Sequence, residues 1–428
     1  MTSFGSDLIL ARLRGLHPKT IDLSLGRIER LLGALGHPER RLPPVVHIAG
    51  TNGKGSVLAM LDAMLHAAGR RVQRYISPHL VHYDERFLFD GRPIADPELA
   101  DVLDQCERVN RGQPITEFEI TTAAGFLAFG RHPADLLLME TGLGGRLDAT
   151  NVIARPKLTA LSPISLDHQG FLGDHLEQIA FEKAGILKPG VPCVVGPQPA
   201  QALAVIEARA AEVGAPLRRH GRDWMARAVD DRLLVAVGDE ELELPLPALP
   251  GCHQIDNAGL AVACALELGE LAPDLPAIAR GLLEASWPAR LQRLSSGPLA
   301  RLLPEGAELR LDGGHNPAAA EALAASMSQG RDPLHLVVGM LSSKDLCGFL
   351  APLAPMASTL RAVPVPDEAA SRDPQEIAGA ALQLGIPAVV AADVASAIGQ
   401  IAAEESAPYQ ILICGSLYLA GHVLREND

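Results

Sequence analysis

The spacing of hydrophobic positions changes near residue 45. Before that point, apolar side chains recur at helical spacing, as at Ile28, Leu31 and Leu35. Beyond it, short apolar runs alternate with helix-length segments, and these runs lie at 45–49, 72–76, 136–139, 158–164 and 191–195. Continuous apolar runs of this length are typical of strands buried on both faces. The pattern predicts an α/β domain with a doubly wound, mostly parallel sheet.

A second series of alternating strands and helices follows Trp287-Pro288. Its predicted strands are 309–311, 334–338, 360–363, 388–391 and 411–414, and its predicted helices include 317–327 and 394–401. Residues 232–246 alternate more regularly and predict a small antiparallel sheet. We expect a large domain over residues 1–287 and a smaller, Rossmann-like α/β domain over residues 288–428.

Composition narrows the class of protein. The 428 residues include 51 acidic and 37 basic side chains, a formal net charge of −14, with no basic stripe of the kind that binds nucleic acid. The six cysteines form no C-x-x-C pair, which favours a reducing compartment over a zinc site or disulfides. There is no amino-terminal signal pattern and no apolar run of about 20 residues that could span a bilayer. We expect a cytoplasmic protein.

The strongest local motif follows the first predicted strand. A glycine-rich turn with a lysine leads into a helix whose apolar residues share one face; the turn consists of Gly50, Thr51, Asn52, Gly53, Lys54, Gly55 and Ser56. Backbone N–H groups at such a helix start can hold phosphate, with Lys54 and the Ser56 hydroxyl reaching phosphate and magnesium. A flexible glycine turn is the alternative. In the common P-loop, G-x-x-x-x-G-K-[ST], the serine or threonine directly follows the lysine. Here Gly55 separates Lys54 from Ser56, so the loop is a more specialised variant.

Polar groups follow the other predicted strands of this domain. Ser77 comes after the second, Glu140 ends the third, and Asp167-His168 follow the fourth. Because ligands bind at the carboxyl ends of parallel strands, we expect these groups near the phosphate loop. Hard oxygen donors with one imidazole suit magnesium. Singly, each has another explanation: Ser77 in a turn, Glu140 paired with Arg146, His168 at a strand end.

The stretch from Asp174 to Lys188 predicts one further helix, with Asp174 as its amino-terminal cap and Gly185 at its end. Lys183 lies in its last turn. A lysine there is favoured by the helix dipole, so spacing alone indicates a surface residue.

At this point the residues resemble a known family, the folylpolyglutamate synthases and dihydrofolate synthases, which are related to the Mur ligases. The matching motifs run in order along almost the whole chain: residues 50–56, 77–80, 140–151, 167–168, 172–174, 182–186, 253–254, 257–258, 287–290, 311–317 and 415–418.

The resemblance implies an ATP-driven amide ligation. A pteroate or folate carboxylate attacks the γ-phosphate, and the amine of L-glutamate displaces phosphate from the acyl phosphate. Two Mg²⁺ sites are implied, one held by Ser56, Ser77 and Glu140 and the other by Glu140 and His168. A monovalent cation is a further candidate cofactor. The family's carbamylated lysine corresponds to Lys183, whose carbamate anion would help to hold the metal.

The resemblance also implies substrate contacts. Arg290, Asp312 and Asn257 are expected to bind ATP, and His315 to contact phosphate or the acyl phosphate. The pterin is expected at three segments: Asp22, Leu23 and Ser24; Thr116, Glu117, Phe118 and Glu119; Leu147, Asp148 and Ala149. Phe118 could stack on the pterin ring or be a core aromatic residue.

The expected partners are small molecules: ATP, L-glutamate, dihydropteroate and reduced folates. We expect no nucleic acid or membrane partner, and a monomer. The residues His168-Gln169-Gly170-Phe171 favour the subgroup with both ligase activities, and an enzyme with only the folylpolyglutamate activity is the alternative. A Mur-type ligase, a GTPase and a binding module without catalysis are more remote alternatives, because about fifty residues precede the loop and no N-K-x-D motif follows.

Overall fold

The computed structural model describes residues 5–17, 21–328, 332–406 and 408–427. Contacts divide the chain into two compact units. The first comprises Met1–Ile164, Leu172–Ala248 and Asp256–Ala285, and the second Ser165–Phe171, Leu249–Ile255 and Ser286–Asp428. The predicted division at residue 287 takes no account of the two short segments, 165–171 and 249–255, that belong to the second unit.

An eight-stranded sheet forms the centre of the first unit, with the order β4-β3-β2-β5-β1-β6-β7-β8. Its strands are β1 Val45–Ala49, β2 Val72–Tyr75, β3 Phe87–Phe89, β4 Arg92–Pro93, β5 Leu136–Glu140, β6 Leu158–Leu161, β7 Cys193–Val195 and β8 Leu217–Arg219. All pairings are parallel except those of β3 with β2 and β4. This confirms the predicted doubly wound, mostly parallel sheet.

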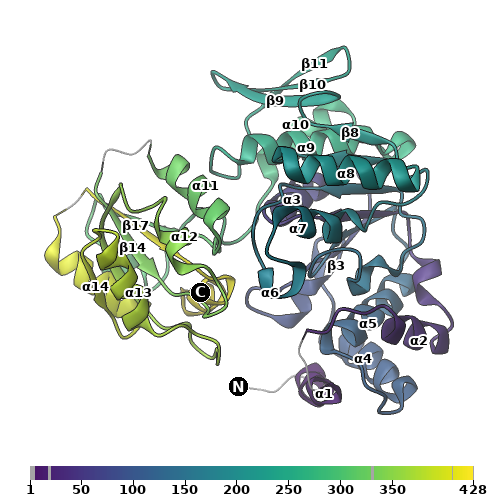
Figure 1. Ribbon diagram of the computed structural model, residues 1–428, viewed down its shortest axis with the longest axis horizontal. Coiled ribbons are helices and arrows are strands. Elements are labelled where there is room, and N and C mark those ends of the chain that lie inside the picture. The colour runs from purple at the N-terminus through teal and green to yellow at the C-terminus, as the bar shows by residue number, and fades with distance from the viewer. Residues whose placement is uncertain (1–4, 18–20, 329–331, 407, 428) are drawn as a thin grey trace. The chain divides into compact units, whose positions relative to one another are not determined.

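Helices cover this sheet, as Figure 1 shows. They are α1 Gly5–Leu13, α2 Gly26–Ala34, α3 Lys54–Ala67, α4 Asp96–Asn110, α5 Glu117–Arg131, α6 Gln169–Leu172, α7 Leu176–Ala184, α8 Ala200–Val213, α9 Gln254–Leu266 and α10 Leu275–Glu284. The first residues of α6 and α9 lie in the short segments of the second unit. The apolar faces of α1, α2, α4 and α5 share one core with Tyr75 and Phe87. A second core lies under α7 and α8.

The antiparallel sheet expected near 232–246 is present but larger. β10 Arg232–Val237 pairs with β11 Glu240–Pro245 as expected, and also with β9 Trp224–Val229, which the sequence did not reveal. Buried Trp224 and Ala226 of β9 pack on Gly259 of α9, where a side chain would collide with them. Packing on α9 therefore stabilises β9 as a strand, although most of its side chains are exposed.

The second unit is built on a six-stranded sheet with the order β12-β13-β17-β14-β15-β16. Its strands are β12 Gln292–Arg293, β13 Glu308–Leu311, β14 Leu334–Val338, β15 Ala357–Ala362, β16 Ala388–Val390 and β17 Gln410–Cys414, and its helices α11 Pro317–Met327, α12 Leu346–Leu350, α13 Pro374–Gln383, α14 Val394–Glu404 and α15 Leu417–Asn427. Only β12 runs antiparallel to its neighbour. Each of the five strands predicted for this unit is present.

Strand ends depart from the prediction in the first unit. β6 ends at Leu161 rather than residue 164, and β7 begins at Cys193 rather than residue 191. The apolar residue Ile164 is buried in a loop, whereas the last residue of β6 that pairs with β1 is Leu161. The predicted strand was therefore too long, because it was based on the run of apolar residues. Within the described residues, no helix is long and apolar enough to cross a membrane.

Candidate active site

The glycine-rich turn lies at the end of the central strand β1, whose five residues are all buried. Gly50 and Gly53 have φ angles of 151° and 87°, which disfavour other residues. Side chains there would also collide with Ser162 and with Asn257. The turn is therefore tightly enclosed, and Asn257, an expected ATP contact, lies beside it.

The start of helix α3 presents backbone N–H groups that a ligand can bind. The N–H groups of Thr51 and Asn52 donate to the Pro163 carbonyl at 3.0 and 3.3 Å, which fixes the turn. The following N–H groups, in the first turn of α3, have no carbonyl one turn earlier in the helix. Together with the helix dipole, N–H groups at such a position can bind phosphate.

Two lysine side chains meet at one backbone oxygen in this turn. Lys54 Nζ donates to the Gly50 carbonyl at 3.1 Å, and Lys183 Nζ donates to the same oxygen at 2.8 Å. Lys183 is only 5% exposed, so the interpretation of it as a surface residue was wrong. Two ammonium groups at one carbonyl repel each other, and a bound anion beside them would offset this repulsion.

Helix α7 brings Lys183 to this position. Its amino-terminal cap is His175, not Asp174 as predicted, and Gly185 ends it as expected. The Arg146 N–H donates to the Glu182 carbonyl at 2.6 Å, and a side chain on Gly185 would collide with the Arg146 backbone. The end of α7 is thus packed directly on the loop after β5, which turns Lys183 toward Gly50.

Glu140 lies beside Lys54 at the end of β5. Its Oε1 lies 3.7 Å from Lys54 Nζ, and its Oε2 is 3.5 Å from the Ser77 backbone nitrogen. The alternative pairing of Glu140 with Arg146 is wrong, because Arg146 binds Glu182 at 2.8 and 3.1 Å. Glu140, Ser77 and buried Ser56 therefore offer a carboxylate and hydroxyls near the carboxyl ends of three neighbouring strands, β5, β2 and β1.

This donor set fits a hard cation. Magnesium prefers oxygen ligands and keeps several waters, so it does not need a cage of protein carboxylates. Accordingly, the described part of the chain contains no group of three or more His, Cys, Asp or Glu side chains arranged to hold a metal. His168 belongs to the second unit, and its part in a metal site stays a prediction.

In the second unit, Asp167 is the centre of a polar cluster. Its carboxylate accepts from Lys344 Nζ at 2.5 Å and from Asn316 Nδ2 at 3.0 Å, and His315 Nε2 lies 3.4 Å away. Burial opposes ionisation of Asp167, but His315, Lys344 and His168 outweigh it and hold its pKa far below the usual range. Sequence reasoning missed Lys344, because its neighbours form no recognisable motif.

The expected nucleotide residues of this unit lie close to one another. Asp312 is 6% exposed and accepts from the N–H groups of Leu291 and Gly314 at 2.8 and 2.6 Å. A side chain on Gly313 would lie 3.2 Å from the Arg290 guanidinium. His315 Nδ1 donates to the Gly313 carbonyl at 2.8 Å. The loop after β13 therefore gathers Arg290, Asp312 and His315.

The three segments expected to bind the pterin are connected in the first unit. Thr116 caps α5 in a capping box with Glu119, whose carboxylate also binds Arg27 at 2.9 Å. The same Arg27 binds Asp22. The Phe118 ring lies over Gly142, where an added Cβ would be 2.5 Å away, and its centroid is 6.5 Å from that of Tyr75. Phe118 is only partly buried against the core, which leaves both of its interpretations open.

The third segment is anchored through buried Asp148. Its carboxylate accepts from the Leu143 N–H at 2.8 Å and from the Thr150 hydroxyl at 2.5 Å. His47 Nε2 lies 2.8 Å from that hydroxyl oxygen. Since the hydroxyl has one proton and donates it to Asp148, His47 must be the donor through Nε2. The sequence did not predict this series of hydrogen bonds from β1 to the segment 147–149, because a lone histidine in an apolar strand forms no recognisable motif.

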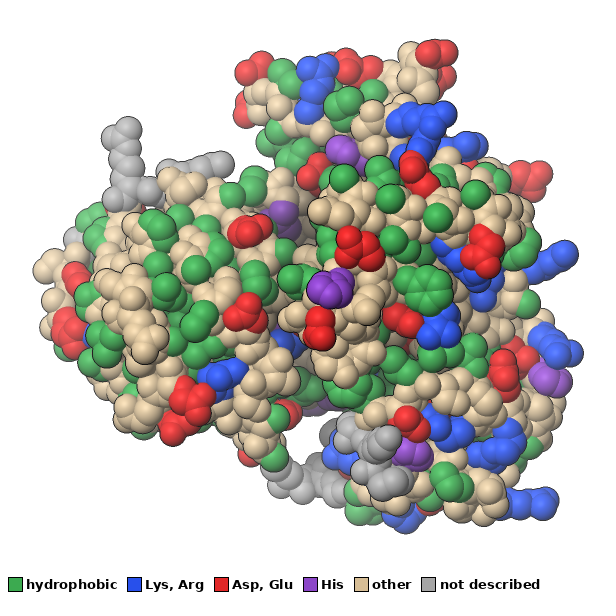
Figure 2. All heavy atoms as spheres, in the orientation of Figure 1, with side chains coloured by type: hydrophobic (Ala, Val, Ile, Leu, Met, Phe, Trp, Pro, Cys, Tyr) green, Lys and Arg blue, Asp and Glu red, His purple; other side chains and the backbone are tan. Residues whose placement is uncertain are grey.

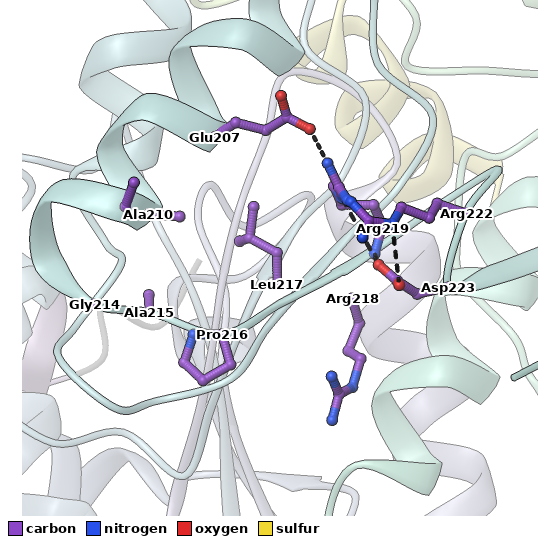
Figure 3. A pocket seen from close by; sticks show the side chains of 11 residues that line it. Glu207, Ala210, Gly214, Ala215, Pro216, Leu217, Arg218, Arg219, Arg222 and Asp223 are labelled. Carbon is purple, nitrogen blue, oxygen red and sulfur yellow. Dashed lines mark hydrogen bonds and ion pairs between the residues drawn. The ribbon is translucent and has the colours of Figure 1, made fainter.

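A separate hollow of about 670 Å³ lies between the end of α8 and β8 (Figure 3). Its side chains are already paired: Arg219 binds Glu207 and the backbone nitrogen of Arg219 binds Asp223. No residue that the sequence singles out lines it. On the face in Figure 2, basic side chains likewise lie among acidic ones rather than in a patch.

Comparison with known proteins gives consistent results. Residues 299–426 match the family described as "Dihydrofolate synthetase, C-terminal domain". The chain is 34% identical to the dihydrofolate synthase/folylpolyglutamate synthase of Escherichia coli, over 98% of this chain and 94% of that protein.

Two solved structures are also similar. The E. coli FolC in complex with DHPP and ADP has a TM-score of 0.89 and 32% identity, covering 99% of this chain and 97% of the other. The Yersinia pestis bifunctional folylpolyglutamate synthase/dihydrofolate synthase complexed with AMPPNP and Mn ion has a TM-score of 0.87 and 33% identity, covering 99% and 98%.

A mostly parallel sheet with a glycine-rich, lysine-bearing turn at the end of its central strand, together with the similarity to these relatives, defines an ATP-dependent ligase. Its similarity extends over nearly the full length of both chains. The chain belongs to the dihydrofolate synthase/folylpolyglutamate synthase family. This membership replaces the Mur-type and GTPase alternatives.

Proposed function

We propose that this enzyme ligates L-glutamate both to dihydropteroate and to the glutamate tail of reduced folates. The observation that carries the proposal is that Lys54 and Lys183 both donate to the Gly50 carbonyl. Lys54 Nζ also lies 3.7 Å from Glu140 Oε1. Lys54 at the start of α3 suits a terminal phosphate that is transferred to a carboxylate.

The reaction requires an activated carboxylate, because a carboxylate oxygen is a poor leaving group. Attack of the acceptor carboxylate on the γ-phosphate forms a C–O–P bond and releases ADP; the glutamate amine then forms the amide, releasing phosphate and a proton. In this proposal the first-turn N–H groups of α3 and Lys54 hold the transferred phosphoryl group. The protein's main contributions are positioning and electrostatic stabilisation.

For the metal, Ser56, Ser77 and Glu140 would hold one magnesium, and Glu140 and His168 a second. Bound magnesium would offset charge on the phosphate oxygens. The solved Y. pestis relative contains Mn ion and AMPPNP, which supports a divalent cation and ATP here. A monovalent cation is a further candidate.

Lys183 is proposed to be carbamylated. Its amine would combine with carbon dioxide and lose two protons relative to the ammonium form, giving an N–H carbamate anion. The crowding of two ammonium groups at the Gly50 carbonyl supports this, because the carbamate would replace repulsion from Lys54 by attraction.

The remaining assignments follow the family. Asn257, Arg290 and Asp312 would bind ATP, and His315 would contact phosphate or the acyl phosphate. Residues 1–287 would serve as the ATP, magnesium and folate domain and 288–428 as the glutamate-ligase-type domain. The E. coli relative was solved in complex with DHPP, which supports a pterin acceptor here. The proposed pterin contacts are Asp22–Ser24, Thr116–Glu119 and Leu147–Ala149. We propose a cytoplasmic monomer without nucleic-acid or membrane partners.

The test is product analysis with ATP, magnesium and L-glutamate. Dihydropteroate and tetrahydrofolate are supplied in separate reactions, and mass spectrometry identifies the ligated products. We expect ADP and one added glutamate in both. If only tetrahydrofolate is ligated, the enzyme has the folylpolyglutamate synthase activity alone. ADP formation that does not depend on any pterin would refute the folate assignment.

A further inference from the structure

Arg27 bridges two chain segments, one that lies 92 residues after it and one that lies five residues before it. It is the second residue of α2. Its Nε donates to Glu119 Oε2 at 2.9 Å, its Nη1 donates to Asp22 Oδ2 at 2.8 Å, and its Nη2 donates to the Asp22 carbonyl at 2.5 Å. One guanidinium thus fixes both the carboxylate and the backbone of Asp22 relative to the start of α5.

The Glu119 end of this bridge is deeply buried. The Glu119 side chain is 4% exposed and that of Arg27 is 20% exposed. Glu119 Oε2 also accepts from the Thr116 N–H and hydroxyl, both at 2.8 Å. Its Oε1 is buried without a hydrogen-bond partner among the described residues. Removal of Arg27 would leave a buried carboxylate without the cation placed against it.

Helix stability does not explain this arginine. A cation in the first turn of a helix opposes the helix dipole, so α2 by itself would favour an acidic or neutral residue there. Burial lowers the pKa of Arg27, but hydrogen bonds and charge interactions with Glu119 and Asp22 outweigh it, and the net pKa is raised. The side chain is therefore stabilised by the two segments that it joins rather than by its own helix.

We propose that Arg27 is a positioning residue for the pterin-bearing acceptor. It holds the segment Asp22–Ser24 at a fixed distance from the segment Thr116–Glu119. The inference rests on the proposed function, in which both segments contact the pterin. Arg27 itself need not touch the acceptor, since its three nitrogens are already directed to Glu119 and Asp22.

Arg27→Ala should raise KM for the acceptor by about 10- to 100-fold, since small misplacements of a binding surface have effects of that size. KM for ATP should stay near the wild-type value, because Lys54 and its loop are untouched. Arg27→Lys should recover only part of the loss, because an ammonium cannot reproduce the fork of three directed donors. Added guanidinium ion should lower the acceptor KM of Arg27→Ala, and added ammonium should not.

The matched control is Arg12→Ala. Arg12 of α1 also binds a carboxylate of another helix, Glu107 of α4, at 2.6 Å, but its side chain is 54% exposed and Glu107 belongs to neither segment. Its loss should leave both KM values unchanged. Thermal unfolding of each variant reports stability separately from binding.

The outcomes separate this inference from the proposed function. A wild-type enzyme without pterin-dependent ADP formation would refute the proposed function. A wild-type enzyme that turns over, together with an unchanged acceptor KM in Arg27→Ala, would overturn the role of Arg27. A parallel rise of both KM values with a lowered melting temperature would also overturn it, because Arg27 would then be only structural. If Arg27→Ala does not fold, the ratio of the two KM values in Arg27→Lys decides.

Discussion

At the scale of single residues, the site depends on a few buried polar side chains whose partners are fixed. Lys183 is directed to the Gly50 carbonyl because the end of α7 is packed on the loop after β5. His47 is held by Thr150, and Asp148 by Leu143 and Thr150. Buried polar groups of this kind are costly to disrupt, so changes at them should have large effects.

Lys183→Ala should reduce turnover by at least about 100-fold, the size of effect seen when a charge-stabilising group is removed. The stability of the fold should change less, because alanine removes only one hydrogen-bond donor to the Gly50 carbonyl. Lys157→Ala, at an exposed position, is the control and should behave as wild type. With isotopically labelled bicarbonate, wild type should show a carbamate signal that Lys183→Ala lacks. Full turnover in the variant would refute the role of Lys183.

His47 makes stability depend on pH. Burial, with a contribution from Lys188, lowers the pKa of His47 from 6.5 to about 3. Above pH about 6.5 the imidazole is neutral in both states and contributes no penalty. As the pH falls from about 6.5 toward 3, the unfolded chain binds the proton and the native protein does not, so stability is lost at about 1.4 kcal/mol per pH unit.

This contribution is measurable by urea unfolding between pH 7 and pH 4.5. His47→Gln should be destabilised at pH 7 but should show a smaller fall in the free energy of unfolding with acidification. His37→Gln, at a side chain that is 41% exposed, is the control and should keep the wild-type slope. Equal slopes in wild type and His47→Gln would contradict the prediction.

At the scale of elements, close packing sets the position of the phosphate loop. The pair α3 and α10 makes one of the most extensive helix contacts of the first unit, and α3 begins at Lys54. At Gly281 of α10, a Cβ would collide with the backbone of Met64 in α3. Backbone cannot move aside as a side chain can, so glycine is required at this crossing.

Gly281→Ala should destabilise the protein by about 1–3 kcal/mol, because overpacking outweighs the better helix propensity of alanine. Gly379→Ala in α13 is the matched control. A Cβ there meets nothing within 4 Å, and the expected result is a stabilisation of about 0.4–1 kcal/mol. Chemical denaturation of both variants measures the difference, and a neutral Gly281→Ala would contradict this account of the α3–α10 contact.

At the scale of the whole molecule, the enzyme should need its divalent cation for catalysis but not for folding. The described residues contain no cluster of three or more His, Cys, Asp or Glu side chains suited to a metal, and extensive apolar cores stabilise both units. Chelation should abolish acceptor-dependent ADP formation, and added Mg²⁺ or Mn²⁺ should restore it. The thermal unfolding curve without nucleotide should not change. Unfolding on chelation would show a structural metal instead.

How far the sequence predicted the fold depends on the type of signal. The strand β1, its loop and the helix α3 were recognisable because an apolar run, glycines and helical periodicity follow one another without a gap. Helix α11 was predicted with its observed bounds, from Pro317 to Met327. The strand β9 was missed, and β6 was extended by three residues, because hydrophobicity reports burial rather than ladder pairing.

The candidate site shows the same division. Motifs in the sequence identified Lys54, Glu140 and Lys183, but the spacing of Lys183 in its helix indicated solvent exposure, and its burial became evident only in the structure. Arg27, Lys344 and His47 were not identified at all. Each acts through a partner at least ninety residues away, and sequence periodicity extends over only a few turns of helix.

The sequence by itself determined the α/β class, the phosphate loop and the family, because these depend on local patterns and on motifs in a fixed order. Only the tertiary structure decided which buried charges meet: Lys183 with Lys54 at one carbonyl, Arg27 with Glu119, and Asp167 with Lys344. The physical reason is that these contacts are set by strand order and helix packing, which bring distant residues within a few ångströms and leave no trace in local composition.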